Sequence, residues 1–156
     1  MRVSEAALEK SIGENARRLA SKTMKEIDEE IYFRAEEMRI YALAKDLAGE
    51  ASDSNVAFDS MPNLHGFISA TDADWIADKD TPAIERVLNN ELSRNLNEYL
   101  EFYNLRYGFP VLAEMYVTNK HGVVIGATGR TSDYLQADEE WYKRAVAETG
   151  SGYWVG

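Results

Sequence analysis

This sequence lacks several features that would indicate a particular class of protein. It contains no cysteine, which excludes thiolate catalysis, cysteine-ligated zinc and disulfide bonds. It also contains no apolar run near the roughly 18 residues that a bilayer-spanning helix needs, so we expect the chain itself to be soluble. With three prolines, 45% hydrophobic residues and 28% charged residues, its composition is that of one ordinary folded domain.

Concentrated positive charge is missing as well. Lysine and arginine total 17 against 27 acidic residues, a formal net charge of −10, and no basic cluster is longer than the pair Arg17-Arg18. Nucleic acids and anionic membrane surfaces are bound through clustered basic residues. We therefore expect neither of them as a partner.

The motifs of common catalytic and metal sites are also absent. There is no GxSxG turn, phosphate-binding glycine loop or dinucleotide fingerprint, and His65 and His121 have no second histidine at metal-ligand spacing. Asp72 and Asp74 resemble the start of a calcium loop, but Ala77 stands where that loop needs glycine. We interpret the acidic residues of this segment as a solvated surface, and we expect no enzyme activity, no cofactor and no metal.

The first fifty residues have the pattern of a long helix. From Ser4 to Ala48 there is no proline and one glycine before the end, Gly13, while apolar residues recur mostly three or four positions apart. Such a helix would extend about 60 Å at about 1.5 Å per residue, too far to pack on one small domain. We expect its exposed apolar stripe to pair with a second copy or another domain. The alternative is two helices that break near Gly13 and pack on one core.

Two further segments precede the region richest in motifs. Between Gly49 and Asp80 the helical periodicity is lost, and we predict a long loop with one or two short helices, one of them capped by Thr71. At Thr81-Pro82 a capping hydroxyl and a proline at the first helical position predict a second helix, which Gly108 and Pro110 end. We interpret this helix as scaffold.

A β-hairpin is predicted from Met115 onwards. Met115 to Thr118 alternates with period two, as a half-buried strand does. Asn119 to Gly122 has the residues of a turn that needs a left-handed glycine, and Val123 to Thr128 forms the returning strand.

A loop, a short helix and another strand are predicted after the hairpin. The loop runs from Gly129 to Ala137, and the helix from about Glu139 to Glu148, with acidic residues at its positive end. Gly150 ends the helix. Tyr153-Trp154-Val155 predicts the final strand.

This order of elements resembles the PAS-like core of a Cache domain. Val117 to Gly122, Thr128 to Tyr134 and Gln136 to Tyr142 are similar to the membrane-distal half of a double Cache sensor, which belongs to sensor histidine kinases and chemoreceptors. The resemblance implies an α+β fold in which a long signalling and dimerisation helix, residues 1–50, precedes a PAS-like antiparallel sheet with flanking helices. Residues 51–156 would be the distal subdomain, stopping before its last strands, and transmembrane helices would lie outside this chain.

Large aromatic side chains and a few charges gather between residues 130 and 154. The set comprises Arg130, Asp133, Tyr134, Trp141, Tyr142, Tyr153 and Trp154. Small-molecule pockets combine aromatic walls with a few polar groups that fix orientation. Arg130 could bind a ligand carboxylate, and Asp133 could bind an ammonium group. The alternative is that Trp141 and Trp154 are core residues and that Arg130 is a surface residue.

In Cache sensors the ligand lies between the sheet and the loop and helix that cover it. The resemblance therefore implies six ligand-binding residues: Tyr116, Arg130, Asp133, Tyr134, Trp141 and Tyr142. Amino-acid-binding members have an arginine two positions before the Trp-Tyr pair, where this chain has Glu139. A ligand carboxylate would then have to bind Arg130, or the ligand is not an amino acid.

These observations lead to the hypothesis of a non-catalytic, extracytoplasmic sensor domain of a transmembrane receptor, such as the sensor histidine kinase of a two-component system. Its ligand would be a carboxylate or amine metabolite, and it would form a homodimer through the N-terminal helix. Ligand binding would favour one of two arrangements and so reach an output domain. The alternative is a protein-interaction module in which the long helix pairs subunits and no small molecule binds.

Overall fold

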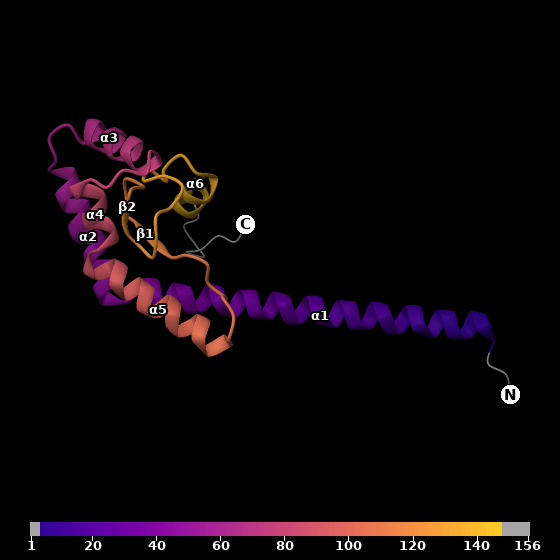
Figure 1. Cartoon of the computed structure of the whole chain (residues 1–156). Helices are drawn as coiled ribbons and strands as arrows, with labels where there is room; N and C mark the ends of the chain where they lie inside the picture. Colours follow the sequence, from indigo (N-terminus) through magenta and orange to yellow (C-terminus); the bar gives the residue numbers. More distant parts are fainter. Residues whose placement is uncertain (1–3, 148–156) are drawn as a thin grey trace. The chain divides into compact units, whose positions relative to one another are not determined.

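A computed structural model describes residues 4–147, which contain six helices and one two-stranded sheet (Figure 1). The fold is α+β, with much more helix than strand. The chain divides into two units, one that ends at Tyr41 and one that begins at Ala42 and contains the sheet. Among the described residues, no helix combines the length and the hydropathy that a bilayer-spanning segment needs.

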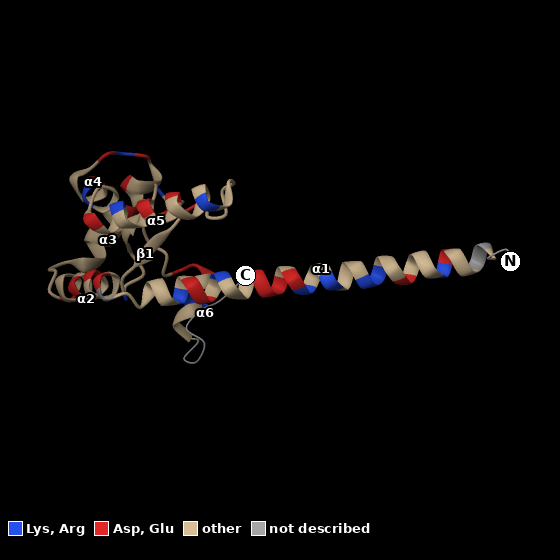
Figure 2. Cartoon of the chain, turned by 90° about the horizontal axis from the view of Figure 1, so that it is seen from below, with Lys and Arg blue, Asp and Glu red and all other residues tan. Residues whose placement is uncertain are grey.

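Helix α1 runs from Glu5 to Ala42 as one continuous element. Ser4 begins it, because the serine Oγ accepts a hydrogen bond from the amide of Ala7 at 3.3 Å. Basic and acidic residues are interspersed along the helix (Figure 2), and ion pairs one turn apart reinforce it. The alternative of two helices that break near Gly13 is therefore wrong.

The segment between Gly49 and Asp80 was predicted as a long loop with one or two short helices. Two helices are present, but they fill most of the segment, so the prediction of a long loop is wrong. α2 spans Lys45–Asp59 and α3 spans Leu64–Ile76. Ala44, with φ −57° and ψ 134°, separates α2 from α1. The predicted first helix therefore does not continue to Ala48, although no glycine or proline marks the break.

Burial explains why α3 is helical. Ile68, Thr71 and Trp75 are its buried residues, and they recur three and four positions apart, as one face of a helix requires. Trp75 is only 1% exposed, and its indole N–H donates to the carbonyl of Thr131 at 2.8 Å. Thr71 is thus a buried interior residue of α3 and not the helix cap that the sequence predicted.

Helices α4 (Pro82–Leu88) and α5 (Glu91–Tyr107) replace the single helix predicted after Thr81. Thr81 caps α4 as predicted. The break falls at Asn90, whose side chain accepts from an amide in the first turn of α5 at 2.8 Å and donates to the carbonyl of Ile125 at 2.7 Å. The same asparagine therefore starts α5 and attaches it to the sheet.

The predicted hairpin is present, with β1 (Tyr116–Thr118) antiparallel to β2 (Val124–Ala127). In the turn, the carbonyl of Asn119 accepts from the amide of Gly122 at 2.9 Å. Gly122 has φ 72°, and a Cβ at this position would lie 2.6 Å from the side chain of Ala137. Both the left-handed backbone and this close approach require glycine.

The core of the second unit lies where the hairpin meets α3 and α4. Trp75, Ile84, Val123 and Val124 are each at most 1% exposed and belong to one buried cluster. The polar loop after β2 leads to α6 (Glu140–Ala147), close to the predicted helix. The predicted helix end at Gly150 and the strand at 153–155 lie outside the described residues.

Candidate functional site

The loop between β2 and α6 is fixed to the sheet and to α3. The carbonyl of Tyr134 accepts from the amide of Val124 at 3.0 Å, and the amide of Gln136 donates to the carbonyl of Gly122 at 2.7 Å. From α3, the carboxylate of Asp72 accepts the amides of Tyr134 and of the next residue at 2.9 and 3.0 Å. These bonds hold the loop in place and set the point at which α6 begins.

Three of the predicted ligand residues meet where α6 faces β1. The rings of Tyr116 and Trp141 make an edge contact, with centroids 5.8 Å apart. The ring of Tyr142 lies 5.7 Å from that of Trp141, and its hydroxyl donates to the carbonyl of Lys120 at 2.9 Å. All three rings are half-buried, so they form a surface that a ligand can reach.

Three carboxylates lie together beside the start of α6. Asp133, Asp138 and Glu139 each offer an oxygen within 4.8 Å of the other two. Asp133 also accepts hydrogen bonds from the Ser132 hydroxyl at 3.1 Å and from the Gln136 amide, which orient it. We call the combined set the aromatic–acidic group: Tyr116, Trp141, Tyr142, Asp133, Asp138 and Glu139.

The phenol of Tyr116 lies within electrostatic reach of this negative charge. Burial raises the pKa of Tyr116 above its ordinary value, and the charges of Glu114, Asp133 and Glu139 raise it further. An ammonium group here would meet both carboxylates and aromatic rings, the two features that bind such a cation. A calcium ion would find three carboxylates among the described residues, whereas it takes roughly six to eight oxygen ligands.

Arg130 is engaged by the C-terminal end of α3. Its guanidinium pairs with the carboxylates of Asp78 and Asp80 at 3.2 and 3.0 Å. It also donates to the carbonyls of Trp75 and Lys79 at 3.1 to 3.2 Å, and it lies 5.4 Å from the centre of the Trp75 ring. These contacts attach the loop after β2 to the last turn of α3 and to the residues that follow it. Binding of a ligand carboxylate by Arg130 would require the loss of some of them.

Tyr134 is a core residue. It is 2% exposed, and its ring lies 5.7 Å from that of Trp75. Burial raises the pKa of its phenol well above the ordinary value. Of the six predicted ligand residues, the structure therefore brings Tyr116, Asp133 and the Trp141-Tyr142 pair into one group, whereas Arg130 and Tyr134 serve the packing of α3 against the loop.

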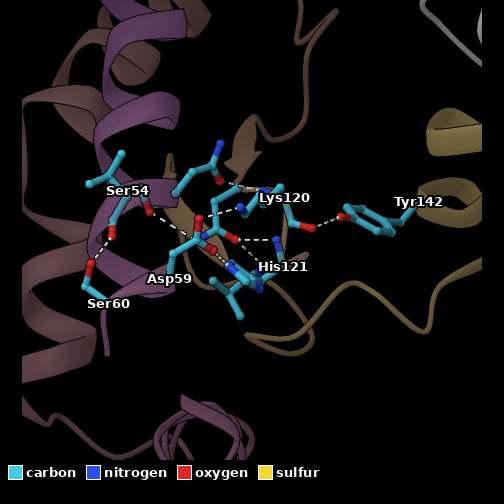
Figure 3. A network of polar contacts seen from close by, with 10 residues as sticks. Ser54, Asp59, Ser60, Lys120, His121 and Tyr142 are labelled. Carbon is cyan, nitrogen blue, oxygen red and sulfur yellow. Dashed lines mark hydrogen bonds and ion pairs between the residues drawn. The ribbon is translucent and has the colours of Figure 1, made fainter. Parts of the chain in front are cut away.

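A polar network fastens the hairpin turn to α2 (Figure 3). The Asp59 carboxylate binds the Lys120 ammonium at 2.5 Å and the His121 imidazole at 3.1 Å, and the imidazole stacks on Phe58. The hydrogen bond from Lys120 lowers the pKa of Asp59 below its ordinary value, and the bond with His121 lowers it further. Because Tyr142 donates to the Lys120 carbonyl, the network connects α2, the turn and α6.

Sequence reasoning missed the roles of several acidic residues. Asp72 anchors the loop, so the interpretation of a solvated surface is wrong for this residue. Asp78 and Asp80 are exposed as expected, but both pair with Arg130, and Asp74 pairs with Lys79 at 2.6 Å. A signal existed for Asp72, which follows Ile68 by four positions and precedes Trp75 by three, and so lies on the buried face of α3. It went unused because the short helix predicted here was expected to begin at Thr71, which placed Ile68 outside it.

Two other predicted pocket residues, Tyr153 and Trp154, lie outside the described residues. Comparison of the chain with protein-family models, with curated proteins and with solved structures finds no match.

Proposed function

We propose that this chain is the ligand-binding, membrane-distal part of an extracytoplasmic sensor with a PAS-like domain of the Cache type, and that its ligand is a small amine. The aromatic–acidic group carries this proposal. It combines Tyr116 of β1, Asp133 of the loop and Trp141 of α6, residues that the Cache resemblance assigns to the ligand. No nucleophile, cofactor or metal has a part in the proposed function.

The charges favour an amine over a carboxylate ligand. Asp133, Asp138 and Glu139 present negative charge beside the rings, where a ligand carboxylate would be repelled. Arg130, the cation that sequence reasoning offered for a carboxylate, is held by Asp78 and Asp80. A primary or quaternary ammonium group would pair with the carboxylates and contact the electron-rich ring faces.

The arrangement of elements supports the PAS-like assignment. The hairpin of β1 and β2 is followed by a loop that hydrogen-bonds back to β2 and then by α6, which contacts β1 through Trp141. Such a cover can shift when a ligand binds beneath it. The network of Lys120, Asp59 and Tyr142 would pass that shift to α2.

A thermal-shift screen tests the proposal. We expect the melting temperature to rise with small amines such as ethanolamine or choline and not with N-acetylethanolamine, which lacks the charge. Asp133→Asn keeps the shape but removes one charge, and should weaken binding roughly 10- to 100-fold, as expected for a charge-assisted hydrogen bond. Glu101→Gln, on an exposed face of α5, is the matched control and should bind normally.

Two results would contradict the proposal. One is the absence of any response across a broad panel of amines. The other is equal binding by the Asp133→Asn and Glu101→Gln variants, since the carboxylate would then have no part in recognition.

The surface of α1 favours a second candidate function, a dimerisation module. Six apolar side chains of this helix each expose between 46% and 67% of their surface: Leu8, Ile12, Leu19, Met24, Ile27 and Ile31. Exposed apolar side chains in such a row mark an interaction surface. Self-association measured by analytical ultracentrifugation, together with silence in the amine screen, would favour this function over sensing.

A further inference from the structure

A cavity of about 410 Å³ lies in the second unit, between α2, α4 and β2. Its walls are mainly apolar and include Phe58, Phe67, Val87, Val124 and Ile125. Volume and lining are those of a small-molecule pocket. No member of the aromatic–acidic group lines it, so it is distinct from the proposed amine site.

Three uncharged polar residues line the cavity, Ser54, Asn90 and Tyr134, and Tyr134 is the most deeply buried of them. Tyr134 lines the cavity and is 2% exposed, and its hydroxyl has no hydrogen-bond partner among the described residues. The hydroxyl oxygen is not fully enclosed by protein atoms, so it keeps contact with open space. A donor in that position is free to bond a ligand that supplies an acceptor.

Charge is confined to the mouth of the cavity. Among the lining residues, only Glu50, Asp53 and Arg86 are charged, and all three are exposed. The inner wall is uncharged, so an ion placed there would lose its hydration without a partner. The cavity therefore favours a neutral molecule over an acid or an amine.

We infer that this cavity is a second binding site, which takes an uncharged, mainly apolar molecule with one hydrogen-bond acceptor that the Tyr134 hydroxyl meets. The protein would then bind two ligands of different chemical classes, the proposed amine and this neutral molecule. It borders α2 and β2, so its occupant would contact both the helix that holds the hairpin turn and the strand beneath the loop.

Two probes of similar shape distinguish the contribution of the hydrogen bond to binding from that of apolar contact. Acetophenone has a carbonyl oxygen that can accept a hydrogen bond, and isopropylbenzene has none. Binding is followed by methyl NMR of Val87, Val124 and Ile125. We expect Tyr134→Phe to weaken the binding of acetophenone roughly 3- to 10-fold, because one hydrogen bond is lost. The affinity for isopropylbenzene should change by no more than about twofold. The variant loses no hydrogen bond within the described residues, and thermal unfolding verifies its fold.

A filling variant confirms the location. Ala57→Trp, on the lining of the cavity, should abolish binding of both probes, whereas Ala70→Trp, on an exposed part of α3, should not. The inference is overturned if neither probe shifts the cavity methyl signals at millimolar concentration. It is equally overturned if Tyr134→Phe weakens both probes alike or neither, or if binding survives Ala57→Trp.

Discussion

Asp72 offers the sharpest test of how the loop over the hairpin is held. Its carboxylate accepts two backbone amides, those of Tyr134 at 2.9 Å and Leu135 at 3.0 Å. Removing it in Asp72→Ala leaves two half-buried donors without their acceptor, and each such loss costs about 1–3 kcal/mol. Because the two amides are adjacent and can partly rehydrate together, we expect a destabilisation of about 2–4 kcal/mol.

The matched control lies two residues further along α3. The carboxylate of Asp74 pairs with Lys79 at 2.6 Å and accepts no backbone amide within residues 4–147, and an exposed ion pair contributes roughly 0–1 kcal/mol. In urea unfolding followed by circular dichroism, Asp72→Ala should have its midpoint at a much lower urea concentration than Asp74→Ala. The dependence of the unfolding free energy on urea concentration should be similar for the two variants. Equal midpoints for the two variants would refute the argument that Asp72 anchors the loop.

Three other predictions concern the turn, the network and α1. Gly122→Ala should destabilise the protein by about 2–4 kcal/mol and Gly108→Ala by about 1 kcal/mol in urea unfolding, because both glycines have φ 72° but only Gly122 lies against Ala137. The pKa of Asp59 is lowered in the folded state, so the stability that it contributes should be present at neutral pH and be lost as the pH falls through that lowered pKa. The difference in melting temperature between the wild type and Asp59→Asn should therefore shrink in acid, and a constant difference would contradict this. Leu19→Glu should weaken self-association in analytical ultracentrifugation without changing the unfolding of the second unit, since Leu19 is 67% exposed on α1.

The sequence alone predicted the structure correctly where one residue determines the conformation of the nearby backbone. Thr81 before Pro82 correctly predicted the start of α4, and Gly108 the end of α5. Asn119 and Gly122 predicted the hairpin turn because their backbone requirements are met within four residues. Asp133 and Trp141 were named from charge and aromatic content, and Tyr116 from the Cache resemblance alone. The structure places the Tyr116 ring beside Trp141 and within electrostatic reach of Asp133.

Only the tertiary structure decided the elements whose stability comes from distant partners. The segment of α3 is rich in polar and small residues, yet it is helical because Ile68 and Trp75 are buried against the hairpin and loop. The break at Asn90 depends on a bond to Ile125, 35 residues away. From the sequence, Arg130 could bind either a ligand or another part of the chain. In the structure it binds a carbonyl of α3 and the carboxylates that follow this helix. A sequence determines such choices only through contacts that form when the chain folds, because the free energy of burial and of ion pairing depends on which groups are brought together.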